Sequence, residues 1–132
     1  MQPKEKLTNG KQAGRILVVD DEPAVCETIK MVLEHDGYKV QAANSGREAL
    51  ILLEQGKFDL VTTDFSMPEM KGDALAAAIK ERLPKLPVMM ISGNGAIAKD
   101  AGNTFPGVDL IINKPFLLED LRTAIAKVLP GV

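Results

Sequence analysis

The sequence predicts an α/β fold in which helices cover both faces of a parallel sheet. Five short apolar segments alternate along the chain with five stretches whose apolar residues recur at helical spacing. Such alternation is typical of parallel strands joined by right-handed helical crossovers. The segments at 15–19 and 87–91 are almost entirely apolar, which indicates strands that are buried on both faces. We therefore expect a doubly wound, five-stranded sheet in a single domain.

Size and composition fit one soluble globular domain. The chain has 132 residues, 45% of them apolar and 26% charged, which is enough to bury a core without disulfides. A net charge of −2 gives no reason to expect direct nucleic-acid binding. The single Cys26 excludes a disulfide framework and fits a reducing cytoplasm. No apolar run approaches the ~18 residues that a membrane span needs, so we expect no membrane partner.

The N-terminal part divides into a tail, a first strand and a first helix. Residues 1–14 contain three lysines and almost nothing to bury, so we expect a flexible tail before a folded domain at 15–132. The strand at 15–19 is followed by Pro23, which suits the first position of a helix because its missing N–H would be unpaired there. We expect that helix to end at Gly37.

The second strand and helix carry clear start and stop signals. Residues 38–43 alternate between the two faces in the pattern of a half-exposed strand at a sheet edge. Ser45 and Glu48 have capping-box spacing, in which each side chain pairs with a backbone N–H at the start of a helix. The helix should run to about Gln55 and stop at Gly56.

The third strand leads directly into a carboxylate. The segment at 59–63 is followed by Asp64. Just beyond it, Pro68 and Gly72 interrupt regular secondary structure. Because proline bars an immediate helix, Asp64 should lie where the strand opens into a loop. A helix follows and closes near Pro84. Its apolar positions are Ala74, Leu75, Ala78, Ile79 and Leu83.

The last third of the chain supplies two more strands. The strand at 87–91 ends on Ser92, and a fifth strand is expected at 108–112. Residues 93–103 should form the fourth helix, which glycines weaken by roughly 1 kcal/mol for each interior position relative to alanine. Apolar residues at helical spacing place the last helix at 118–129, with Leu118 on its apolar face.

Three carboxylates are expected to meet at one edge of this sheet. The exposed second strand favours the order 2-1-3-4-5, the flavodoxin-like arrangement, whose switch point lies between strands one and three. Asp20 and Asp21 end the first of these strands and Asp64 ends the third. Carboxylates this close repel one another unless a cation joins them. Oxygen ligands without His or Cys point to Mg²⁺ or Ca²⁺, and the lack of an EF-hand acidic ladder favours Mg²⁺.

Two further polar groups are expected at the same edge. Strand four brings the hydroxyl of Ser92, and strand five brings the ammonium of Lys114. A carboxylate nucleophile, a divalent cation, a hydroxyl and an amine together make a phosphoryl-transfer site.

This set of residues resembles the receiver domain of bacterial two-component response regulators, in its single-domain, chemotaxis-regulator-like form. The resemblance covers about 15–129. It rests on motifs at the ends of strands one, three, four and five, namely Asp20-Asp21, Asp64 with Met67-Pro68 and Gly72, Ser92, and Lys114-Pro115-Phe116. Each motif alone is common, but all of them in this order form a specific signal.

The resemblance implies a phospho-acceptor and a set of metal ligands. Asp64 would accept a phosphoryl group from the phosphohistidine of a histidine kinase or phosphotransfer protein. Asp21, Asp64 and the main-chain carbonyl of Ser66 would ligate Mg²⁺, with Asp20 acting mainly through bound water.

The resemblance also implies how the phosphoryl group is held and read. Ser92 would donate a hydrogen bond to one phosphoryl oxygen and Lys114 would pair with another. A downstream partner protein would bind the face formed by 93–129. Family members usually carry Tyr or Phe three residues before this lysine, where this chain has Ile111. Isoleucine has no ring to turn, which puts that form of readout in question but not phosphorylation.

Other functions stay open from the residues alone. We interpret the chain as a signalling module and not an enzyme, since it would promote only its own phosphorylation and dephosphorylation. It would be either free-standing or the receiver segment of a larger response regulator or hybrid kinase. An aspartyl-phosphate phosphatase would carry a second acid two residues after the nucleophile, where this chain has Ser66. A flavodoxin-like electron carrier needs a first loop that cradles a phosphate, and Asp20-Asp21-Glu22 would repel one.

Overall fold

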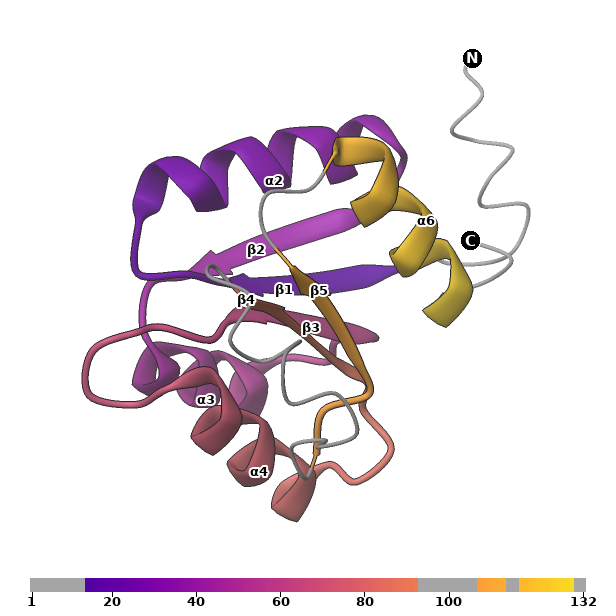
Figure 1. Cartoon of the computed structure of the whole chain (residues 1–132). Helices are drawn as coiled ribbons and strands as arrows, with labels where there is room; N and C mark the ends of the chain where they lie inside the picture. The colour runs from indigo at the N-terminus through magenta and orange to yellow at the C-terminus, as the bar shows by residue number, and fades with distance from the viewer. Residues whose placement is uncertain (1–13, 93–106, 114–116, 130–132) are drawn as a thin grey trace.

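The computed structural model of the chain describes residues 14–92, 107–113 and 117–129 (Figure 1). Within them, five parallel strands form one sheet in the order β2-β1-β3-β4-β5, which confirms the predicted order and the edge position of the second strand. The strands are β1 (Arg15–Val19), β2 (Lys39–Ala43), β3 (Leu60–Asp64), β4 (Val88–Ser92) and β5 (Leu110–Asn113). The helix predicted at 93–103 and residues 1–13 of the predicted tail lie outside the described residues.

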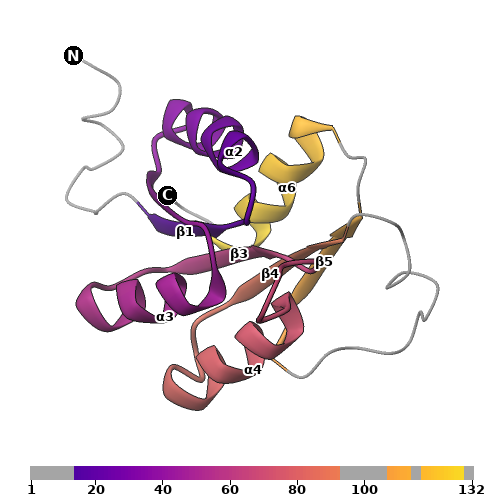
Figure 2. The ribbon, with the colours of Figure 1, turned by 90° about the vertical axis from the view of Figure 1, so that its left-hand side faces the viewer.

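The helices of the described residues cover the sheet on both faces, as a doubly wound fold requires (Figures 1 and 2). On one face lie α2 (Pro23–His35) and α6 (Leu118–Val128), and on the other lie α3 (Gly46–Gln55) and α4 (Gly72–Arg82). In this part of the chain, no helix combines the length and apolar character that crossing a membrane requires.

The sheet divides the core into two apolar clusters. Ile16 and Val18 pack with α2 and α6, whereas Leu17 and Val19 pack with α3 and α4. All four side chains are buried, because alternate residues of a strand point to opposite faces of the sheet. This two-sided burial explains why β1 is almost entirely apolar. Cys26 of α2 is buried in the same cluster as Ile16 and Val18.

The residues predicted to begin and end α3 do so in the structure, with one difference in the capping contacts. α3 runs to Gln55 and ends at Gly56, and Ser45 Oγ accepts a hydrogen bond from the Glu48 N–H at 3.0 Å. The Glu48 carboxylate differs from the capping-box prediction, since it accepts from the N–H of Asn44 at 2.8 Å, one residue before the cap. Glu48 thereby ties the end of β2 to the start of α3.

Some predicted boundaries and faces differ from the structure. β3 and β4 each lie one residue later than predicted. β5 begins at Leu110, two residues late, and just before it the Asp109 carboxylate accepts a hydrogen bond from the Val88 N–H at 2.8 Å. Leu118, predicted on the apolar face of the last helix, is 43% exposed, because the buried stripe of α6 begins only at Leu121.

An ion pair joins the two helices on one face of the sheet. Asp36 follows the end of α2, and its carboxylate accepts a hydrogen bond from Arg122 Nε of α6 at 2.8 Å and a second from Nη2. These hydrogen bonds hold the pKa of the Asp36 carboxyl below its usual range, against the opposing effect of burial. A lowered pKa in the folded state means that the pair stabilises the fold above the ordinary Asp pKa. That contribution is lost as the pH falls through the folded pKa.

Replacing Asp36 by Asn should therefore make the melting temperature depend less strongly on pH in the acid range. At neutral pH the variant should melt about 3 °C below the unmutated chain, since a partly exposed ion pair contributes modestly. The two melting temperatures should converge as the pH falls below the ordinary Asp pKa and through the lowered pKa of Asp36, where its carboxyl takes up a proton. Circular dichroism melts across this range check the prediction. A gap that stays constant down to pH 2 would mean that the lost contact is not electrostatic.

Candidate functional site

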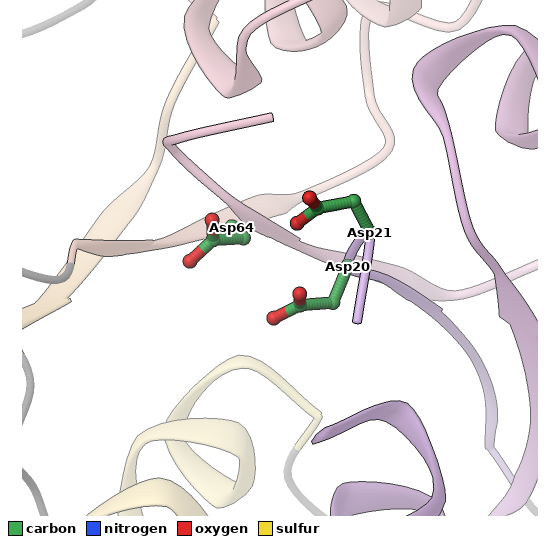
Figure 3. Close-up of side chains that lie close together, drawn as sticks. All are labelled: Asp20, Asp21 and Asp64. Atoms are coloured by element: carbon green, nitrogen blue, oxygen red, sulfur yellow. The ribbon is translucent and has the colours of Figure 1, made fainter. Parts of the chain in front are cut away.

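Three carboxylates converge where β1 and β3 end (Figure 3). Asp20 and Asp21 directly follow β1, and Asp64 is the last residue of β3. One oxygen of each carboxylate lies within 4.8 Å of the other two. Asp20 and Asp64 are buried, at 4% and 6% exposed, whereas Asp21 is exposed. The structure thus brings together the three acids that the sequence places at the switch point of the sheet.

Hydrogen bonds hold the corner formed by Asp20 and Asp21. The Asp20 N–H donates to the Ala43 carbonyl at 3.1 Å, which extends the pairing of β1 with β2 beyond the strand. The Asp20 carboxylate accepts from the Glu22 N–H at 3.0 Å, just before α2. The Asp20 carbonyl accepts from the side-chain amide of Asn44 at 3.0 Å. Sequence reasoning missed Asn44, because an asparagine after an edge strand carries no signal of a contact so far along the chain.

The backbone at Gly72 packs closely against the backbone of Asp64 and Phe65. The loop after β3 returns so that the Gly72 N–H donates to the Phe65 carbonyl at 2.9 Å. A Cβ atom on Gly72 would lie only 2.5 Å from the Asp64 carbonyl oxygen. Position 72 therefore admits a side chain only if the backbone shifts. This close approach explains why a glycine stands at the interruption of secondary structure that the sequence predicts here.

The loop that follows Asp64 contains a strained turn. The Met70 N–H donates to the Pro68 carbonyl at 2.7 Å across Glu69, whose φ of 69° lies in the left-handed region. A γ-turn of this kind is uncommon at a residue other than glycine. Ser66 lies at the start of this loop, two residues beyond Asp64, and the ligand role of its main-chain carbonyl stays a prediction.

A buried hydroxyl lies at the end of the strand next to Asp64. Ser92 ends β4, which pairs with β3, and its side chain is fully buried. Among the described residues, Ser92 Oγ has no hydrogen-bond partner. Such a group requires an explanation, and an oxygen of a bound ligand supplies one. Ile111 is half-buried in β5, paired with Met90, and Lys114 lies outside the described residues.

The donor set fits a hard divalent cation. Three carboxylates this close, two of them buried, repel one another unless a cation joins them, and oxygen donors suit Mg²⁺ or Ca²⁺. The Cys26 thiol donates to the Asp20 carbonyl at 3.4 Å. Burial, and after it the charge of Asp20, raises the pKa of the Cys26 thiol to about 11. The thiol therefore stays protonated at neutral pH in this environment, where it donates to the backbone carbonyls of Asp20 and Ala43.

Fold and site together define a class of protein, the doubly wound α/β domains with an acidic, cation-suited cluster at the switch point. Residues 16–126 match the model of the response regulator receiver domain. The chain belongs to this family, whose members are the phospho-acceptor signalling modules of two-component systems.

Individual relatives agree with this assignment. The response regulator MprA of Mycolicibacterium vanbaalenii is 35% identical over 107 residues, which cover 81% of this chain and 46% of that protein. The signal receiver domain of a signal transduction histidine kinase from Syntrophus aciditrophicus has a TM-score of 0.82 at 34% identity, over 91% of this chain and 92% of that one. The response regulator TrrA of Thermotoga maritima, solved in complex with Mg²⁺-BeF, has a TM-score of 0.78 at 30% identity, over 87% and 98%. This chain spans about half the length, or less, of the curated relatives it matches.

Proposed function

We propose that this chain accepts a phosphoryl group on Asp64 in a Mg²⁺-dependent reaction and changes conformation as a result. The observation that carries the proposal is the convergence of Asp20, Asp21 and Asp64 at the ends of β1 and β3. The buried hydroxyl of Ser92, unpaired among the described residues, supports it from the neighbouring strand. Membership of the receiver family and a similar structure solved with Mg²⁺-BeF support the same chemistry.

The phosphoryl donor would be the phosphohistidine of a histidine kinase or phosphotransfer protein. An oxygen of the Asp64 carboxylate forms a bond to phosphorus while the bond from phosphorus to the imidazole nitrogen breaks. The departing imidazole takes up a proton, and the product on this chain is an acyl phosphate. In this scheme the chain is a signalling receiver that promotes only its own phosphorylation and dephosphorylation.

The surrounding residues bind and orient the reacting groups. Asp21, Asp64 and the main-chain carbonyl of Ser66 would hold the metal, and Asp20 would act mainly through bound water. Mg²⁺, when bound, supplies positive charge that offsets the negative charge on the phosphoryl oxygens. The Ser92 hydroxyl would donate a hydrogen bond to one of those oxygens.

The C-terminal part of the chain would hold and read the phosphoryl group. Lys114 would pair with a second phosphoryl oxygen, and a downstream partner protein would bind the face formed by 93–129. Of that face the structure describes β5, with Ile111, and α6. The receiver would occupy 15–132 and make no direct contact with nucleic acid.

Incubation with acetyl phosphate and Mg²⁺ should add a single phosphoryl group to this chain. Intact-mass measurement should show that species for the unmutated protein and for Asp73→Asn, a matched control that changes a carboxylate in the first turn of α4, outside the cluster. EDTA or the substitution Asp64→Asn should abolish the added mass. A phosphorylated Asp64→Asn protein would overturn the assignment of the acceptor.

A further inference from the structure

We propose that Asn44 is a positioning residue of the acidic site: its side-chain amide fixes the peptide between Asp20 and Asp21 and so keeps the Asp21 carboxylate in the cluster. The inference rests on the proposed function, because it assigns Asn44 a part in cation binding. Asn44 itself makes no contact with the metal in this proposal and acts through the backbone of Asp20.

Residues at the end of β2 hold the backbone of Asp20, which directly follows β1. The Asp20 N–H donates to the carbonyl of Ala43, at 3.1 Å, and the Asp20 carbonyl accepts from Asn44 Nδ2, at 3.0 Å. Two consecutive residues beside β1 therefore bind both polar backbone groups of Asp20. The orientation of the Asp20 carbonyl determines the plane of the peptide that leads into Asp21.

Asn44 is a stronger donor to this carbonyl than the Cys26 thiol. Its amide lies within the normal range for an N–H···O hydrogen bond. The other donor is the Cys26 thiol, at 3.4 Å, and a thiol is a weak donor. If the amide of Asn44 is removed, the weaker of these two donors, the Cys26 thiol, remains at the Asp20 carbonyl.

Asn44 is itself held in place by the start of α3. Its backbone N–H donates to Glu48 Oε1 at 2.8 Å, and Glu48 in turn donates its N–H to Ser45 Oγ at 3.0 Å. The amide that reaches Asp20 therefore projects from an anchored backbone. This arrangement provides the supporting shell that keeps metal ligands in a productive geometry.

The Asp21 carboxylate depends on this support more than the other two acids do. It is exposed, and within the described part of the chain it makes no hydrogen bond of its own. Its position is therefore set by its backbone, which begins at the Asp20 peptide. Mg²⁺ demands near-octahedral geometry at short distances, so a small rotation of this peptide should weaken binding.

A Mg²⁺ titration of the full chain, followed by the amide resonances of Asp21 and Asp64, tests the inference without any activity assay. Asn44→Ala should raise the Kd for Mg²⁺ about tenfold, the usual effect of losing a residue that orients a metal ligand. Asp36→Asn is the control: it breaks the ion pair with Arg122, outside the cluster and outside the contacts that hold Asn44, lowers the melting temperature by about 3 °C and should leave the Kd unchanged. Unshifted resonances in β4 would verify that both variants are folded.

Asn44→Asp separates positioning from charge. The new carboxylate has the same shape but cannot donate to the Asp20 carbonyl, and it adds a negative charge beside the cluster. Charge alone would tighten Mg²⁺ binding, whereas loss of positioning weakens it, and we expect weaker binding.

Several outcomes would overturn the inference. These are an unchanged Kd in Asn44→Ala, tighter binding in Asn44→Asp, or an equal loss in Asn44→Ala and Asp36→Asn, which would indicate general loosening. If the unmutated chain itself binds no Mg²⁺, the proposed function fails first. A positive titration of the unmutated chain together with an unaffected Asn44→Ala would reject the role of Asn44 alone.

Discussion

Mg²⁺ should raise the melting temperature of this chain, and the substitution Asp21→Asn should abolish that rise. Without a cation, the carboxylates of Asp20, Asp21 and Asp64 repel one another in the folded state, and unfolding separates them. A cation that binds only the folded arrangement stabilises it by RT ln(1 + [L]/Kd), which is roughly 1–3 kcal/mol at saturating ion. For a domain of this size that corresponds to a rise of several degrees.

The same repulsion gives Asp21→Asn the opposite effect in EDTA. The variant loses one of three like charges, so its metal-free melting temperature should lie above that of the unmutated chain. Asp73→Asn, which changes a carboxylate outside the cluster, should leave the response to Mg²⁺ intact. Thermal melts in EDTA and at increasing Mg²⁺ check both statements. If Mg²⁺ leaves the melting curve of the unmutated chain unchanged, the cluster is not a metal site.

The acidic cluster was predictable because topology alone brings its members together. In a parallel sheet the carboxyl ends of neighbouring strands meet at one edge, so Asp20 and Asp64 become neighbours once β1 and β3 are adjacent. That adjacency followed from the alternating pattern of 38–43, which suits an edge strand and leaves β1 with β3 on its other side. The burial of Ser92 likewise follows from its place at the end of an apolar central strand.

Contacts between distant residues were not predictable in the same way. Arg122 reaches Asp36 across 86 positions, and the amide of Asn44 reaches the Asp20 carbonyl across 24. Many polar residues of the chain have the groups to form such contacts, and periodicity does not select among them. The left-handed backbone of Glu69 is also invisible in the sequence, because it is imposed by the turn that closes the loop after β3.

Gly72→Ala should destabilise the chain and impair phosphorylation together. Alanine favours helices over glycine, but here its Cβ would lie 2.5 Å from the Asp64 carbonyl oxygen and 3.0 Å from Phe65 Cα. Both atoms belong to backbone and cannot rotate away, so the strand end must shift. We expect the free energy of unfolding to fall by about 1–3 kcal/mol, the usual range for overpacking. Because the shift acts on Asp64 itself, the rate of phosphorylation by acetyl phosphate should fall as well.

Gly56→Ala is the matched control for this clash. Gly56 follows α3 in an extended backbone, and among the described residues a Cβ there would meet only the Arg15 guanidinium, at an ordinary 3.6 Å. Restricting the unfolded chain at such a site leaves stability unchanged or raises it by about 0.4–1 kcal/mol. Urea unfolding should therefore show that Gly72→Ala is less stable than the unmutated chain and that Gly56→Ala is at least as stable. The initial rate of phosphorylation should fall only in Gly72→Ala. A Gly72→Ala protein as stable and as reactive as Gly56→Ala would mean that the backbone behind Asp64 tolerates displacement, and that the close approach of Gly72 does not position the acceptor.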